Sequence, residues 1–228
     1  MKKILAATIF TFFLFSATAQ KLTKISLQSN GQFDRVTFDL GESVVIHLSK
    51  EGQIIKWGVD IYAGRDDNFK DRLDEYTGKT GYYAATDDSS FRGKIKFIGR
   101  TYLTYYPSYE NELLKGKLKS IGNMMIDYYQ AYDNEAYRGN IKNAGPLLFT
   151  WYSSFDNEST KGKLKSMGTT ALAYYTSFDD KAFRGKIKSI GRSTYTYYSS
   201  FDRPEYRGSL KTGSQTINES GVKYYTRW

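Results

Sequence analysis

The chain contains no cysteine, a single histidine and only three prolines among its 228 residues. Without cysteine, neither disulfide bonds nor a thiol-linked lipid anchor can form, so stability must come from burial and backbone pairing. The single histidine, His47, cannot build a histidine-based metal site, and its place in the stretch VVIHLS predicts a strand residue, not a catalytic base. No apolar run is long enough to cross a membrane as a helix.

The sequence also lacks the patterns that carry most enzyme chemistry. It has no glycine-rich loop that could cradle a phosphate and no zinc-ligand spacing. The carboxylates of Asp133, Asp156, Asp179 and Asp202 recur once per repeat, whereas a glycosidase needs one converging pair. The adjacent Asp179 and Asp180 supply fewer oxygens than Ca²⁺ requires. We therefore predict that the protein is not an enzyme and has no catalytic residue, no metal site and no cofactor.

The first nineteen residues have the pattern of a secretory signal. A short basic start is followed by the mostly apolar residues 4–15, and Ala17-Thr18-Ala19 supplies the small residues that a signal peptidase recognises before Gln20. We predict export to the periplasm or the cell surface, with a mature chain that begins near Gln20 and has no transmembrane segment.

The mature chain would be basic and rich in aromatic residues. Removing the leader leaves 31 basic and 24 acidic side chains, a net charge of +7. This charge favours an anionic glycan or lipid headgroup as partner, with nucleic acid ranked below both, although net charge also serves solubility alone. Aromatic residues make up 17% of the chain, and 21 residues are tyrosines, which predicts an all-β fold because strands favour aromatic side chains.

The most regular feature is a repeat of 23 residues. Five complete copies cover residues 92–206, a partial copy precedes them at residues 80–91, and an irregular copy closes the chain. Fixed-period self-similarity with atypical ends predicts stacked structural units with caps. Two glycine columns follow the period without insertion: Gly93, Gly116, Gly139, Gly162, Gly185 and Gly208, then Gly99, Gly122, Gly145, Gly168 and Gly191.

Alternation within each copy predicts two β-strands. In all five copies the column that begins at Leu103 is apolar, the column at Thr104 is small or polar, and the column at Tyr105 is aromatic. The Leu103 and Tyr105 columns should therefore face inward. Some apolar positions also fit helical spacing, but two glycines per copy would cost a helix about 1 kcal/mol each. We expect a turn or bulge around Gly99 and a longer connection around the SSFD stretches, where Asx-turns could form.

In the first strand of each copy, apolar residues alternate with cations. Ile95 and its equivalents should face inward, and Arg92, Lys94 and Lys96 should share the opposite face. In a parallel solenoid, lysines of one column would lie about 4.8 Å apart, whereas hairpins separate them by about 9.6 Å and weaken their repulsion. We therefore predict an elongated antiparallel sheet of stacked β-hairpins, with a parallel β-solenoid as the alternative.

An aromatic-x-glycine motif opens several copies, as in Phe91-Arg92-Gly93, Tyr137-Arg138-Gly139, Phe183-Arg184-Gly185 and Tyr206-Arg207-Gly208. This motif resembles the opening of a MORN-type repeat, and the 23-residue period is similar as well. The phrases GKLKSIG and YY also resemble the bacterial variant of that family found in exported antitoxin-like repeat proteins. The resemblance covers roughly residues 80–211 and implies a hairpin-repeat sheet with a non-enzymatic binding role.

The remaining segments are read as caps. Residues 20–79 contain the predicted strands RVTFDL, SVVIHLS and QIIKWGVDIY, the last two joined by a turn at Lys50-Glu51-Gly52. We expect one short helix after them, ending at Gly78, and we place this N-terminal β cap on the same sheet as the repeats. The predicted order is a signal peptide (1–19), the N-terminal cap (20–79), hairpin repeats (80–211) and a C-terminal cap (212–228).

A basic, tyrosine-rich sheet face is the predicted binding surface. It would hold an extended anionic polymer, a glycan or glycolipid, or a protein partner, because tyrosine rings stack on sugars and ammonium groups pair with anions. Lysine stems that merely cover tyrosine rings on a solvated face are the simpler interpretation. Two further alternatives are a structural or protein–protein interaction module of the cell envelope and an outer-membrane β-barrel. The predicted ligand-binding residues are Lys96, Lys119, Lys142, Lys165, Lys188, Tyr106, Tyr129, Tyr152, Tyr175 and Tyr198.

Overall fold

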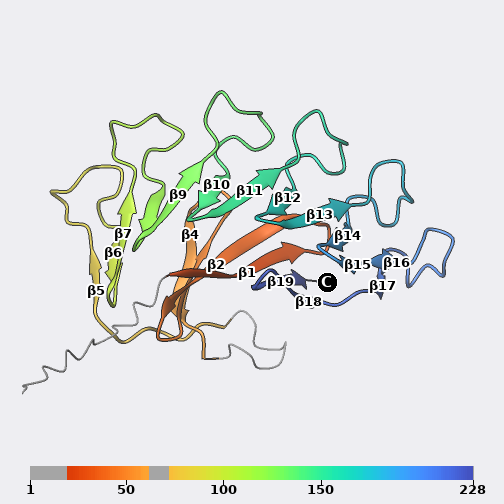
Figure 1. Ribbon diagram of the computed structural model, residues 1–228, viewed down its shortest axis with the longest axis horizontal. Coiled ribbons are helices and arrows are strands. Elements are labelled where there is room, and N and C mark those ends of the chain that lie inside the picture. The colour runs from red at the N-terminus through yellow and green to blue at the C-terminus, as the bar shows by residue number, and fades with distance from the viewer. Residues whose placement is uncertain (1–19, 62–71, 228) are drawn as a thin grey trace, which may run out of the picture.

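The computed structural model describes residues 20–61 and 72–227, which form an all-β protein. The strands are arranged as an eleven-stranded sheet, a six-stranded sheet and a two-stranded ribbon (Figure 1). The predicted signal peptide, residues 1–19, lies outside the described residues. Within the described residues, no helix is long and apolar enough to cross a membrane.

The eleven-stranded sheet is built from the repeats. Strands that neighbour each other in this sheet are consecutive in the chain, and every pair is antiparallel, which confirms the stack of hairpins over the parallel alternative. In chain order its strands are β5 (Thr80–Tyr82), β6 (Ile95–Ile98), β7 (Thr101–Tyr105), β8 (Leu118–Ile121), β9 (Met124–Tyr128), β10 (Ile141–Ala144), β11 (Leu147–Trp151), β12 (Leu164–Met167), β13 (Thr170–Tyr174), β14 (Ile187–Ile190) and β15 (Ser193–Thr194). The ribbon of β16 (Thr196–Tyr197) and β17 (Leu210–Thr212) follows.

Two glycines per repeat lie at the two connections, and the predicted turn at Gly99 is confirmed. Gly99 has a φ of 59° and takes the first position of the two-residue loop between β6 and β7, a position that glycine fills without strain. The longer loop between β7 and β8 closes at Gly116, where the amide donates to the carbonyl oxygen of Tyr106 over 2.8 Å. A Cβ atom at Gly116 would lie 2.6 Å from the backbone oxygen of Ser90, so the neighbouring repeat also requires glycine there.

The N-terminal strands form a second sheet. It contains β1 (Lys21–Gln28), β2 (Phe33–Gly41), β3 (Val44–Leu48) and β4 (Ile54–Val59), joined by β18 (Thr216–Glu219) and β19 (Val222–Arg227) from the other end of the chain. Their order is β18-β19-β1-β2-β3-β4, and β1 and β19 run parallel. The prediction that the N-terminal cap extends the repeat sheet was therefore wrong. The two caps pair with each other because the inner face of the repeats needs an apolar cover.

The core lies between the two sheets. Figure 1 shows the repeat sheet arching over the six-stranded sheet. One continuous apolar cluster joins them, with Leu103 and Phe149 from the repeats and Ile25 and Phe38 from the second sheet all 0% exposed. The columns that begin at Leu103 and Tyr105 are buried in all five copies, as predicted. Burial of this apolar surface is the main stabilising contribution in a chain without disulfides.

Turns of the second sheet also reach the repeats directly. The predicted turn at residues 50–52 joins β3 to β4, and the carbonyl oxygen of Lys50 accepts a hydrogen bond from the amide of Ile141 over 2.7 Å. The rings of Phe33 and Trp151 meet edge to face with centroids 5.4 Å apart. These contacts fix the arch on the sheet beneath it.

The helix predicted to end at Gly78 is not present in the described part of that segment. Residues 72–79 are irregular, and Asp74 forms an isolated antiparallel bridge with Val59. Two backbone hydrogen bonds of 2.9 and 3.0 Å between these residues hold the segment extended, so pairing with the end of β4 replaces helical hydrogen bonding. The helix was predicted within residues 66–78, and the rest of that segment, residues 66–71, lies outside the described residues.

Candidate functional site

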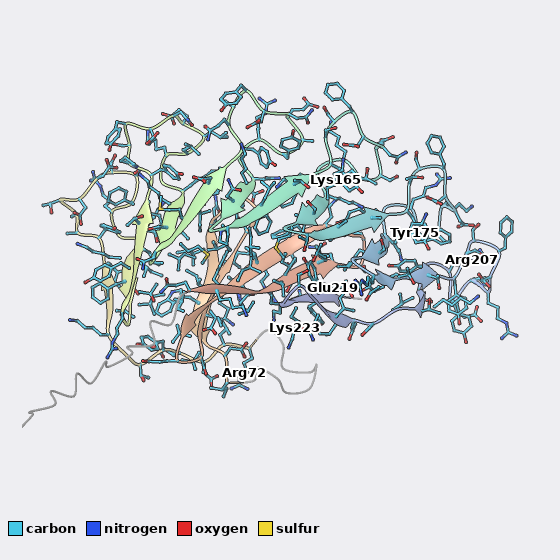
Figure 2. The ribbon with its side chains drawn as sticks, in the orientation of Figure 1. Arg72, Lys165, Tyr175, Arg207, Glu219 and Lys223 are labelled. Carbon is cyan, nitrogen blue, oxygen red and sulfur yellow. The ribbon has the colours of Figure 1, made fainter. Side chains whose placement is uncertain are left out.

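Each predicted lysine lies over a tyrosine, but the tyrosine belongs to the preceding repeat. The distance from the lysine Nζ to the ring centroid is between 5.1 and 5.5 Å in all six pairs. The pairs are Lys96 over Tyr83, Lys119 over Tyr106, Lys142 over Tyr129, Lys165 over Tyr152, Lys188 over Tyr175 and Lys211 over Tyr198. Each contact is a cation–π interaction that links two hairpins. Figure 2 labels one lysine and one tyrosine of this set, Lys165 and Tyr175, near the loop side of the sheet.

The tyrosines of this set also act as latches between repeats. Five hydroxyls donate to a backbone carbonyl twenty residues further along the chain, over 2.9 to 3.2 Å. The donor–acceptor pairs are Tyr83 to Leu103, Tyr106 to Ile126, Tyr129 to Phe149, Tyr152 to Leu172 and Tyr175 to Tyr195. Burial raises the pKa of Tyr106, Tyr129, Tyr152 and Tyr175. Tyr198, in the last copy, packs beside Tyr206 with ring centroids 5.5 Å apart.

These contacts show that the tyrosine column links neighbouring repeats. One ring face lies under a lysine ammonium, and the hydroxyl is engaged by a carbonyl, so little of the ring is left for a ligand. Of the lysines above the rings, Lys142, Lys165 and Lys188 are exposed, whereas Lys96 and Lys119 are half-buried. The lysine half of the predicted set therefore fits a binding surface better than the tyrosine half, whose ligand-binding role stays a prediction.

A second lysine column turns inward, contrary to the prediction that Lys94 shares a face with Lys96. Lys94, Lys117, Lys163 and Lys186 lie 4.8 to 5.2 Å from the centroids of the inner tyrosine rings, and each donates to the glycine carbonyl one repeat further on. A register irregularity in the neighbouring strand pairs interrupts the two-residue alternation at this point. Burial lowers the pKa of Lys163 to about 8, and its ammonium also donates to the carbonyl of Asn30 over 2.7 Å.

The cations that remain at the surface concentrate on the repeats. Residues 80–211 contain 20 basic and 13 acidic side chains, so their net charge of +7 equals that of the whole predicted mature chain. Besides the Lys96 column, one cation per copy is exposed at the end of each long loop: Arg92, Lys115, Arg138, Lys161, Arg184 and Arg207. Figure 2 shows Arg207 at the last of these loops. Each repeat thus carries two outward cations.

The recurring loop aspartates are occupied by hydrogen bonds within the loops, whereas Glu112 and Glu135 pair with the loop cations Lys115 and Lys161 over 3.4 and 2.9 Å. Asp133, Asp156, Asp179 and Asp202 each accept from the amide three residues earlier, over 2.5 to 2.6 Å. Hydrogen bonds from Ser153, Thr176 and Ser199 lower the pKa of Asp156, Asp179 and Asp202 respectively. The oxygens of these aspartates are thus engaged by donors within their own loops.

The predicted Asx-turns are made by the next residue column instead. Asp88, Asn111, Asn134, Asn157 and Asp180 accept from the amide two residues later. Four of them also accept from a serine amide in the next loop, twenty residues on, over 3.0 Å: Ser108, Ser154, Ser177 and Ser200. Each loop is therefore tied both to itself and to its neighbour, and the loop array is rigid.

Sequence reasoning missed a row of exposed rings at the loop tips. Five aromatic side chains, one per complete copy, are almost fully exposed: Tyr109 at 86%, Tyr132 at 87%, and Phe155, Phe178 and Phe201 at 93% each. The signal was present in the sequence, because this column holds only tyrosine or phenylalanine within otherwise polar loops. It was not recognised because an aromatic residue in a loop is ordinarily expected to fold back onto the protein.

His47 has the structural environment expected of a strand residue. It lies in β3, is 3% exposed, and its Nδ1 is 2.9 Å from the hydroxyl oxygen of Thr37. Burial, together with the positive charges of Arg35, Lys24 and Lys56, lowers the pKa of His47 to about 3. The imidazole therefore stays neutral at physiological pH and packs in the second sheet without burying a charge.

Comparison of the chain with protein-family models, with curated proteins and with solved structures returned no match. The resemblance of the aromatic-x-glycine motif to MORN-type repeats therefore stays a prediction. Function must be argued from the surface itself, that is, from its two outward cation columns and its exposed rings.

Proposed function

We propose that the protein is an exported, non-enzymatic binding protein that holds an extended anionic polymer along the outward cations of its repeats. The observation that carries this proposal is the placement of charge. The repeats hold the whole net charge of +7, and each copy has two cations that are exposed or half-exposed, one on its first strand and one at the end of the long loop. Equivalent lysines recur every two strands, about 9.6 Å apart, so a long chain can meet them in turn.

Several features support a binding role over catalysis. His47 is buried and neutral, and the recurring loop aspartates accept backbone hydrogen bonds, so neither is disposed to transfer protons to a substrate. The MORN-like motif implies a binding module, and the leader pattern of residues 1–19 supports export to the periplasm or the cell surface. Each cation contributes little to the binding free energy alone, and the affinity for a long polymer comes from the cations of successive repeats acting together.

Charge removal tests the proposal. The test variant changes Lys96, Lys119, Lys142, Lys165 and Lys188 to Gln, and the control changes Lys21, Lys24, Lys50, Lys56 and Lys223, all outside the repeats, to Gln. Both variants lose five charges. The test variant should bind polygalacturonate about tenfold or more weakly and show a flatter salt dependence, because screening acts on the charges it has lost. The control should retain its affinity for polygalacturonate. Equal losses of affinity in the two variants would contradict the proposal, because they would show that only the net charge of the protein matters.

A protein–protein interaction module is the second candidate, and the edge strand β4 favours it, because among the described residues its outer edge is bridged only at Val59, by Asp74. β4 is the last strand of that sheet, and Ile55 on it is 53% exposed. A groove lined by β4, Tyr105 and Leu118 runs beside it. An exposed strand edge can pair with a strand from another chain. Replacing Ile55 by Lys would weaken such pairing and leave polygalacturonate binding unchanged.

A further inference from the structure

The five loop-tip rings are the most exposed aromatic side chains of the described residues. They are Tyr109, Tyr132, Phe155, Phe178 and Phe201, and we call them the rim rings. Other exposed apolar side chains of the repeats, such as Tyr102, Met125 and Leu148 on the outer sheet face, are only 44 to 58% exposed. Burial of a phenyl ring is favourable, so five rings held in water forgo a substantial stabilisation.

Loose loops do not explain this exposure. The loop that carries Phe178 is closed by the hydrogen bond from Thr176 to Asp179 and tied to the preceding loop by the amide of Ser177, which donates to Asn157 over 3.0 Å. Equivalent bonds recur in the neighbouring loops. The rim rings therefore project from a rigid support, as side chains that anchor a ligand do.

A cation accompanies the rings in the loops. The Nε of Arg184 donates to the carbonyl oxygen of Asp179, and the Nε of Arg207 donates to that of Asp202, both over 2.9 Å. Asp179 directly follows Phe178, and Asp202 directly follows Phe201, so each guanidinium is held beside the backbone of a rim ring. Every complete copy has an aromatic residue and a basic residue at these two places. The loops thus offer an apolar ring face together with a positive charge.

The shape of the rim selects the kind of partner. Figure 1 shows the long loops fanning outward along the convex side of the arch. A flat surface such as a bilayer touches only part of a convex arc, whereas a flexible chain can follow all of it. The rings are separate, with one per hairpin spaced at least about 9.6 Å apart, and do not form the contiguous apolar patch typical of a protein interface.

We propose that the rim rings form a contact line for an acidic polysaccharide, whose sugar rings lie against the aromatic faces while its carboxylates pair with the loop cations. This inference rests on the proposed function and adds the chemistry of the polymer, a chain of sugar rings. Aromatic faces pack on the C–H faces of a sugar, and such packing resists salt, whereas charge pairing does not. The rim rings should therefore determine affinity at high salt.

The test compares two anionic chains, polygalacturonate, which has sugar rings, and inorganic polyphosphate, which has none. The rim variant carries Tyr109→Ser, Tyr132→Ser, Phe155→Ser, Phe178→Ser and Phe201→Ser. The control variant carries Tyr102→Ser, Met125→Ser and Leu148→Ser, which remove exposed apolar side chains from the sheet face. Dissociation constants are measured for the predicted mature chain, residues 20–228, at low and high salt, and circular dichroism verifies that both variants fold.

The rim variant should lose about tenfold or more in affinity for polygalacturonate, with the larger loss at high salt, and should bind polyphosphate as the parent does. The control variant should bind both polymers normally. Unchanged polygalacturonate binding by the rim variant would overturn this inference and leave the proposed function intact, as would an equal loss of affinity for polyphosphate. A parent that binds neither polymer would overturn both.

Discussion

The hydroxyl of Tyr129 donates a hydrogen bond to the carbonyl oxygen of Phe149, 2.9 Å away and twenty residues further along the chain. The same ring lies under Lys142 and against Tyr137, so one side chain joins two repeats by three kinds of contact. A hydrogen bond from a half-buried hydroxyl contributes more to folding stability than one from an exposed hydroxyl does. The repeating tyrosine column is therefore part of what holds the hairpins in register.

Removing this latch should be measurable. Tyr129→Phe deletes only the hydroxyl and leaves the Phe149 carbonyl without that donor, so we expect a loss of about 0.5 to 1.5 kcal/mol in the free energy of unfolding. Tyr132→Phe, the same change at a ring that is 87% exposed, should cost less than about 0.5 kcal/mol. Urea unfolding followed by circular dichroism measures both. A Tyr129→Phe protein as stable as the parent would show that the hydrogen bond from Tyr129 to Phe149 does not stabilise the fold.

The inward columns should be far more sensitive than the outward ones. Leu164 is 0% exposed, so Leu164→Ala should cost about 2 to 5 kcal/mol through lost burial and a cavity. Leu148→Ala removes the same atoms from a side chain that is 44% exposed on the outer face and should cost well under half as much. Similar losses at the two positions would contradict the facial assignment of the repeat strands.

The buried His47 makes stability depend on pH. Its pKa in the folded chain is about 3, below the unfolded value near 6.5, so the unfolded chain binds the extra proton and the folded state loses stability as pH falls below 6.5. Between pH 7 and pH 5 the loss should be about 2 kcal/mol. His47→Gln should remove this slope, since the chain has no other histidine and the carboxylates titrate lower. If the free energy of unfolding of His47→Gln still fell between pH 7 and pH 5, groups other than His47 would be responsible for the pH dependence.

The rigidity of the loops depends on the side chains that bridge them. Asn157→Ala removes the acceptor for the amide of Ser177, so hydrogen exchange at Ser177 should accelerate clearly. The amide of Tyr175, which donates to the carbonyl oxygen of Lys186 within the hairpin, should exchange as in the parent. Exchange measured by NMR resolves both positions. An unchanged Ser177 rate would mean that the loops are held by other contacts.

The repeat sheet could be predicted because its information is local. Hydrophobic alternation, the glycine columns and the spacing of lysines all recur within 23 residues, and they indicated hairpins with inward Leu103 and Tyr105 columns. The inward turn of Lys94 could not be predicted in the same way. A register irregularity shifts the alternation by one residue there, and strict alternation is the only signal that the sequence offers.

The second sheet was the larger omission. β1 pairs in parallel with β19, for example Ile25 with Tyr224, and no local pattern links residues that far apart. The row of rim rings was visible as a column of aromatic residues, but its exposure depends on how the loops are tied by Asn134, Asn157 and Asp180 to the loops that follow. Those ties span twenty residues and become apparent only when the repeats are stacked.

The pairing of β1 with β19 also constrains how the chain can evolve. Repeat arrays ordinarily gain or lose units freely, because each unit contacts only its neighbours. In this protein the strands on either side of the repeats, β1 and β19, belong to one sheet, which the chain must reach from each end of the arch. A duplicated 23-residue unit would lengthen the arch by two strands, about 9.6 Å, while the sheet that spans it kept its width. We therefore expect the pairing of β1 with β19 to constrain the number of copies, so that insertions are tolerated in the long loops more readily than as whole repeats.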